Sequence, residues 1–86
     1  MKIEYTTRFL RKAKKLQIND QRKLSERIEW FSKNMSDPRL KTHVLSGKFS
    51  GYYSFSLDYS KRVVGRKIDT DTITLIDVGS HDEVYR

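Results

Sequence analysis

Alternation of apolar and polar residues in the second half of the chain predicts strands of an antiparallel sheet. In residues 53–58, Tyr, Phe and Leu alternate with Ser, Ser and Asp, which is the period-2 pattern of a strand with one buried face. Runs rich in β-branched residues follow at 62–68 and 72–78, separated by short polar turns. We therefore expect a three-stranded antiparallel meander that buries one face and leaves the other open.

A helical period replaces this alternation in the first half of the chain. Residues 2–5 alternate once and predict a short N-terminal strand that joins the sheet. After it, Phe9, Ala13 and Leu16 recur at helical spacing, and most of the positions between them are Lys or Arg. This pattern indicates a first amphipathic helix with a strongly basic outer face.

A longer second helix is expected to follow after a short connection. Its apolar stripe consists of Leu24, Ile28, Phe31 and Met35. Asn19 and Asp20 are suited to cap its start, and Pro38 is expected to end it at 36–38 because proline disfavours the helical conformation in the residue before it. The two helices should form an antiparallel hairpin over the buried face of the meander, which makes the fold class α+β.

The size of the chain limits it to one domain, which we expect to span residues 1–86. No apolar run approaches the roughly 20 residues that cross a bilayer, and the first residues lack the apolar stretch of a signal peptide. There is no cysteine, hence no disulfide and no thiolate metal site. These features predict a cytoplasmic protein without a membrane partner.

The net charge of +7 is unevenly distributed along the chain. Residues 7–33 hold nine Lys or Arg against three Asp or Glu, and residues 39–67 hold seven against one, whereas the balance after residue 67 is acidic. Basic helices beside a basic open sheet face suit a polyanion such as nucleic acid, or an acidic protein partner. An ordinary solvated basic surface is the alternative.

The histidines stand at the two ends of the predicted meander. His43 precedes it, His81 follows it, and Arg62 begins its central strand. If the three side chains converge on the open face, they can cleave RNA without a metal: one imidazole takes the proton of the ribose 2′-OH, the other protonates the 5′-oxygen, and the guanidinium stabilises the phosphorane. Tyr85 could stack on a base or assist proton transfer.

Each of these residues also has a structural interpretation. His43 could be a surface residue of a loop, and His81 could cap a C-terminal turn. Arg62 could form an ion pair with Asp58 or Asp77.

No cofactor or metal ion is expected from the motifs. The segment 81–83 is a poor metal site because consecutive residues do not converge on one ion. No Gly-rich phosphate loop and no dinucleotide fingerprint occurs. Trp30 lies off the apolar stripe, so it either packs on the N-terminal strand or a loop, or anchors a protein partner.

The order of the motifs resembles the RelE/ParE superfamily of bacterial toxin-antitoxin toxins over nearly the whole chain. After a strand and a basic helical hairpin ending at Asp-Pro come H-V-L-S-G-K-F-S-G-Y-Y-S-F-S-L, then K-R-V-V, then G-S-H-D-E-V-Y. The YoeB-like and YafQ-like toxins of the RelE branch are the most similar. The resemblance implies a microbial-RNase-like α+β fold and a ribosome-dependent mRNA endonuclease held inactive by a cognate antitoxin. Its partners would then be the antitoxin, mRNA in the ribosomal A site, and rRNA.

The resemblance also implies roles for individual residues. His43 lies where the family has its general base, a carboxylate in YoeB-like and a histidine in YafQ-like members. Arg62 matches the arginine that stabilises the transition state, and His81 matches the general acid. Tyr85 matches a C-terminal aromatic residue by its position after the histidine. Basic residues where the family generally binds RNA are Lys48, Lys61, Arg66 and Lys67.

The chain departs from the pattern of this family around Gly65. Gly65 stands where many relatives carry a large apolar or aromatic residue, and residues 66–68 make the strand one residue longer, which predicts a β-bulge at Gly65.

A ParE-like toxin that inhibits DNA gyrase by binding is the alternative function, and it does not require His43, Arg62 and His81. A basic RNA-binding module would bind polyanions with a steep salt dependence and would not cleave them.

Overall fold

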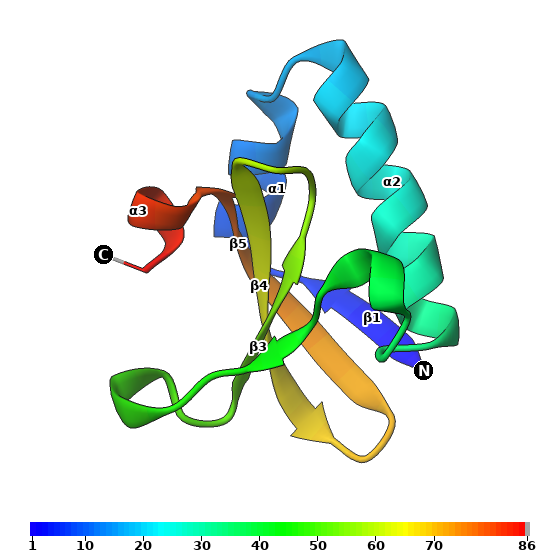
Figure 1. Ribbon diagram of the computed structural model, residues 1–86, viewed down its shortest axis with the longest axis vertical. Coiled ribbons are helices and arrows are strands. Elements are labelled where there is room, and N and C mark those ends of the chain that lie inside the picture. The colour runs from blue at the N-terminus through cyan, green and yellow to red at the C-terminus, as the bar shows by residue number, and fades with distance from the viewer. Residues whose placement is uncertain (86) are drawn as a thin grey trace.

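Strands from both halves of the chain pair in one mixed sheet (Figure 1). The computed structural model describes residues 1–85, and within them the sheet has five strands in the order β1-β5-β4-β3-β2. β1 is parallel to β5, and the other neighbours are antiparallel. The strands are β1 (Lys2–Tyr5), β2 (His43–Val44), β3 (Tyr52–Ser56), β4 (Lys61–Asp69) and β5 (Thr72–Ser80).

The predicted α+β class and the meander β3-β4-β5 are confirmed, but the sheet is wider than expected. β1 joins it as predicted, and β2 extends the opposite edge. The residues of β2 were expected in a loop, which is wrong, because a strand of two residues is too short to show a period of two.

A helical hairpin covers one face of this sheet. α1 (Thr7–Lys14) and α2 (Ile18–Lys33) run in opposite directions (Figure 1). The Thr6 hydroxyl caps α1 by accepting the backbone N–H of Phe9 at 3.0 Å. Two 3₁₀ turns, η1 (Pro38–Leu40) and η2 (Gly47–Phe49), and a short C-terminal helix, α3 (His81–Val84), complete the elements of the described chain. No helix within residues 1–85 has both the length and the apolar character needed to cross a bilayer.

Both predicted ends of the second helix are wrong by a few residues. Helix α2 begins at Ile18 without a side-chain cap, and Asp20 lies in its first turn, where its carboxylate is 3.4 Å from Lys61 Nζ on β4. The helix ends at Lys33, and Pro38 instead starts η1, where Asp37 accepts the backbone N–H of Arg39 at 3.0 Å. Asp20, which looked like a helix cap, thus forms a tertiary ion pair, and Pro38, which looked like a helix end, begins a separate turn.

Trp30 packs against the loop that follows α2, as the structural interpretation expects. It is half-buried, and the guanidinium carbon atoms of Arg39 and Arg27 lie 3.7 and 4.7 Å from the centroid of its ring. Its indole is therefore occupied by two cation–π contacts within the same chain.

The core lies between the helical hairpin and the sheet. The rings of Phe31 on α2 and Phe55 on β3 stack with centroids 4.5 Å apart at its centre. The buried residues packed around them include Phe9, Leu24, Leu40, Leu57, Val63, Ile73, Leu75 and Val78. Half of the ten buried core residues were assigned to inner faces from the sequence, namely Phe9, Leu24, Phe31, Phe55 and Leu57.

The register of β4 and β5 breaks at the position predicted for a bulge. Val64 pairs with Asp77 and Gly65 pairs with Leu75, so the additional residue, Ile76, belongs to β5 rather than to β4. A second break leaves Ile68 additional on β4. On one side of the first break lie the start of β4, which contains Arg62, and the end of β5, which leads into α3. This end of the sheet carries the candidate functional side chains.

Candidate active site

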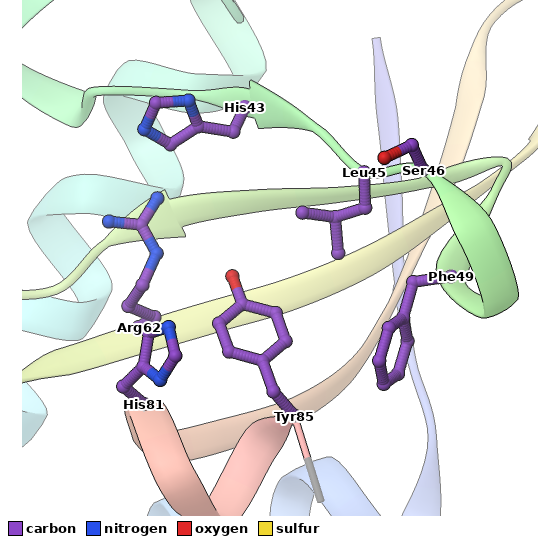
Figure 2. A pocket seen from close by; sticks show the side chains of 7 residues that line it. All are labelled: His43, Leu45, Ser46, Phe49, Arg62, His81 and Tyr85. Atoms are coloured by element: carbon purple, nitrogen blue, oxygen red, sulfur yellow. The ribbon is translucent and has the colours of Figure 1, made fainter.

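Segments that are remote in sequence meet at one end of the open sheet face. They form a cleft of about 440 Å³, which we call the open-face cleft. Its lining consists of His43, Leu45, Ser46, Phe49, Arg62, His81 and Tyr85 (Figure 2). Four of these residues are the candidates that the sequence singled out for chemistry.

The register of the sheet explains why His43 and Arg62 share this face. His43 on β2 pairs with Ser54 on β3, and Arg62 on β4 pairs with Ser56, two residues further along β3. Paired residues, and residues two apart on one strand, point to the same side of a sheet. Figure 2 shows the guanidinium of Arg62 between the rings of His43 and His81.

Arg62 is fixed by hydrogen bonds to neutral oxygen atoms. Its Nε donates to Ser54 Oγ at 2.6 Å, and its Nη2 donates to the carbonyl oxygens of Lys41 at 3.0 Å and Ser54 at 3.2 Å. The predicted alternative of an ion pair with Asp58 or Asp77 is not found in the described part of the chain. Arg62 therefore brings a positive charge into the cleft that no neighbouring carboxylate neutralises.

Helix α3 presents His81 and Tyr85 to the cleft. Ser80 caps it by accepting the backbone N–H of Glu83, and the Glu83 carboxylate accepts the backbone N–H of Ser80 at 2.8 Å. The side chain of His81 is 73% exposed, so its imidazole is accessible from solvent. The ring of Tyr85 lies 4.6 Å from the His81 ring and 5.8 Å from the ring of Phe49, each in an edge contact.

The hydroxyl of Tyr85 already has a partner within the protein. It donates to Ser54 Oγ at 2.5 Å, so Tyr85 is tied to the centre of the sheet. This position suits a support for His81 better than a free stacking surface, and base stacking by Tyr85 stays a prediction.

None of the four residues predicted to bind RNA lines the open-face cleft. Lys48 is in η2, with its Nζ 5.2 Å from the centroid of Phe49, and the guanidinium of Arg66 lies 5.7 Å from the Tyr52 ring. Lys61 turns toward the helices, and Lys67 is exposed further along β4. Their role in RNA binding stays a prediction.

Ser54 is a central residue of the site that the sequence did not reveal. The strand pattern assigned it to the exposed face, yet it is completely buried, because Arg62 and Tyr85 cover it. Phe49, Leu45 and Ser46 were also missed as cleft residues. The only signal in the sequence was their position between His43 and the meander.

The basic residues of α1 form a second cleft, which we call the basic cleft. It has a volume of about 490 Å³, and its cationic lining is Arg8, Arg11, Lys12, Lys15 and Lys61. The buried carboxylate of Asp77 lies 2.5 Å from Lys12 Nζ and 3.2 Å from Arg8 Nη2. Arg11 and Lys15 form no ion pair within residues 1–85, and they lie one helical turn apart.

The turn that leads into β4 is held by Asp58. Its carboxylate accepts the backbone N–H groups of Ser60 and Lys61, each at 2.9 Å. Partial burial acts to raise the pKa of Asp58, but these hydrogen bonds and the charge of Lys61 together hold the pKa below its ordinary value. A carboxylate is thus engaged next to Arg62 without pairing with it.

No group of three or more His, Cys, Asp or Glu side chains in residues 1–85 is arranged to hold a metal ion.

No protein-family model matches this sequence, and no curated protein sequence matches it.

Solved structures with the same fold include bacterial toxins. YafQ from E. coli superposes with a TM-score of 0.82 at 19% identity, covering 98% of this chain and 97% of YafQ. A YoeB/ParE toxin from Agrobacterium tumefaciens gives 0.80 at 19% identity, covering 94% and 99% of the two chains. A copper-bound mutant toxin from Helicobacter pylori gives 0.79 at 26% identity, covering 98% of each.

YafQ is also matched in the E. coli DinJ-YafQ toxin-antitoxin complex, at a TM-score of 0.79, 19% identity and coverage of 98% of this chain and 96% of YafQ. The resemblance to RelE-branch toxins that the motifs indicate is confirmed at the level of the fold.

Proposed function

We propose that this protein is the toxin of a type II toxin-antitoxin pair and that it cleaves mRNA in the ribosomal A site. The observation that carries the proposal is that His43, Arg62 and His81 line one solvent-accessible cleft. A cleft that joins two accessible imidazoles to a guanidinium without a carboxylate partner suits an anionic phosphodiester.

The proposed reaction is an attack of the ribose 2′-oxygen on the adjacent phosphorus. His43 as general base takes the proton of the 2′-OH, and the new 2′-O–P bond forms as the P–O5′ bond breaks. His81 as general acid gives a proton to the leaving 5′-oxygen. Arg62 stabilises the negative charge that grows on the phosphorane oxygens. The products are a 2′,3′-cyclic phosphate and a 5′-hydroxyl.

The proposed partner is a cognate antitoxin in the cytoplasm. YafQ, which has the same fold, is held by DinJ in a toxin-antitoxin complex. A net charge of +7 favours an antitoxin segment rich in Asp and Glu, which would compete with RNA for the basic surface.

The experiment is cleavage of a defined mRNA on purified ribosomes by wild type, His43→Ala and His81→Ala. Each variant should reduce the rate about 10²- to 10⁴-fold, the usual contribution of a general acid or base. Tyr59→Ala is the matched control, because this side chain is fully exposed and lies outside the cleft lining, and it should cleave at the wild-type rate.

A second arm replaces the ribose at the cleaved position by 2′-deoxyribose, which should abolish cleavage. Wild-type rates in the double variant His43→Ala, His81→Ala would refute the chemistry. If the wild type leaves mRNA intact and blocks DNA supercoiling by gyrase instead, the ParE-like alternative holds.

A further inference from the structure

Ser54 is a polar side chain at the centre of the sheet with no access to solvent. Its exposed fraction is 0%. A hydroxyl oxygen has two lone pairs, and Ser54 Oγ accepts one hydrogen bond from Arg62 Nε at 2.6 Å and one from the Tyr85 hydroxyl at 2.5 Å. One buried atom therefore holds two residues that arrive from β4 and from the end of α3.

The hydrogen bonds of Arg62 fix which edge of the guanidinium faces the cleft. A guanidinium has five N–H donors, and Nε and Nη2 of Arg62 donate to Ser54 and to the carbonyl oxygen of Lys41. In the described part of the chain, the donors of Nη1 have no protein acceptor. Nη1 is therefore the group that Arg62 can offer to a phosphoryl oxygen.

The same oxygen atom acts on His81 through Tyr85. The Tyr85 hydroxyl is tied to Ser54, and its ring makes an edge contact with the imidazole of His81, with centroids 4.6 Å apart and planes at 65°. The position of the His81 imidazole thus depends on the Tyr85 ring, whose hydroxyl is held by Ser54.

We infer that Ser54 is a positioning residue for RNA cleavage, setting Arg62 directly and His81 through Tyr85. This inference rests on the proposed function. Loss of the hydroxyl leaves Arg62 with its positive charge, so RNA binding and KM should change little. It also removes the two hydrogen bonds to Ser54 Oγ that hold Arg62 and Tyr85 in position. Transition-state stabilisation requires this geometry, so kcat should fall about 10²-fold.

The first test compares Ser54→Ala with Ser56→Ala. Ser56 lies on the same strand, and its hydroxyl donates to the Asp58 carbonyl at 2.7 Å, away from the cleft lining. Only Ser54→Ala should lower kcat. Wild-type kcat in Ser54→Ala, or an equal loss in Ser56→Ala, would overturn the inference.

The second test asks whether Ser54 and Tyr85 act as one unit. Tyr85→Phe should lower kcat in the wild-type background and have no further effect on Ser54→Ala, because the acceptor is then already absent. Independent, multiplicative losses would overturn the link. Ser54→Cys, which nearly keeps the side-chain volume and weakens the acceptor, replaces Ser54→Ala in both tests if circular dichroism shows that the alanine variant is unfolded.

A third measurement does not depend on cleavage. In ¹⁵N NMR, the Nε–H of Arg62 should exchange slowly with solvent in wild type and in Ser56→Ala, and rapidly in Ser54→Ala. Rapid exchange in wild type would overturn the role of Ser54 whatever the RNA assay shows. Slow exchange in a wild type that does not cleave RNA would overturn the proposed function and leave the Ser54 contact established.

Discussion

Gly65, which has no side chain, lets β4 and β5 pack closely where their register breaks. A Cβ atom at Gly65 would lie 3.0 Å from Ile73 Cγ2, 3.0 Å from Leu75 Cδ2 and 3.2 Å from the Thr74 carbonyl oxygen. Ile73 and Leu75 are core residues without free space, so they cannot move aside without loss of packing. Gly65 is therefore required here by the approach of its neighbours rather than by its backbone angles.

Gly65→Ala is expected to lower the free energy of unfolding by about 1–3 kcal/mol, as overpacking of a core does. Urea unfolding followed by circular dichroism measures the change. Lys67→Ala on the same strand is exposed and should stay within about 0.5 kcal/mol of wild type. Equal stability of Gly65→Ala and wild type would show that the strands separate there without cost.

Individual residues differ in how far the sequence predicted them. His43, Arg62 and His81 were singled out because few residue types move protons or stabilise phosphate charge, and because the motifs around them resemble a known family. The structure places all three in the open-face cleft, and their catalytic roles stay predictions. Ser54 was assigned to the wrong environment, since its burial depends on two side chains that reach it from β4 and from α3. No local pattern around position 54 contains that information.

At the scale of elements, the turn between β3 and β4 controls the start of the strand that carries Arg62. Asp58 organises this turn through its hydrogen bonds to Ser60 and Lys61. Because its pKa is lowered in the folded protein, Asp58 contributes stability above its unfolded pKa of about 3.9. That contribution is lost as the pH falls through the lower, folded pKa.

Asp58→Asn is therefore expected to be less stable than wild type at pH 7, and the difference should shrink below about pH 4. Thermal unfolding at pH 7 and at pH 2.5 measures both values. Asp71→Asn changes the net charge equally in another turn and serves as the control. A difference for Asp58→Asn that grows on acidification would contradict the assigned role of the carboxylate.

Elements were predicted well where a long pattern specified them and poorly where a few residues did. β3, β4 and β5 each carry several alternating or β-branched residues, and their turns contain Asp or Gly. β2 consists of two residues and forms only because the neighbouring β3 offers a free edge. Asp20 illustrates the same limit, because its ion pair with Lys61 exists only after the start of α2 has come close to the start of β4.

At the scale of the molecule, positive charge is gathered around two clefts. The open-face cleft contains Arg62, and the basic cleft contains Arg11 and Lys15 among its cations. Both adjoin α3, since His81 lines the first cleft and Glu83 lines the second. Under the proposed function, RNA at the first cleft would therefore meet a second region of positive potential on the same molecule.

The double variant Arg11→Gln, Lys15→Gln should weaken binding of single-stranded RNA and reduce the slope of log K against log salt by about 1.4, the loss of two phosphate contacts. Fluorescence anisotropy over a salt series measures this slope. Arg22→Gln, Lys23→Gln removes the same charge from α2, outside the basic cleft, and should change the slope less. Equal slopes for the two double variants would show that net charge, and not the basic cleft, governs binding.

The position of β1 in the sheet could not be predicted from the sequence pattern. The pattern of residues 2–5 predicts that β1 joins a sheet, but the choice of β5 as its parallel neighbour depends on the whole chain. This pairing places the N-terminal strand beside a strand about 70 residues later, and α1 then crosses beside β5.

The pairing of β1 with β5 also limits when the sheet can close during synthesis of the chain. During synthesis β1 leaves the ribosomal exit tunnel before the other strands, and its neighbour in the sheet, β5, is the last strand to emerge. The helical hairpin can form early, but His81 and Tyr85 are synthesised after every strand of the sheet. The five-stranded sheet, and the open-face cleft that it supports, can therefore form only after β5 has been made.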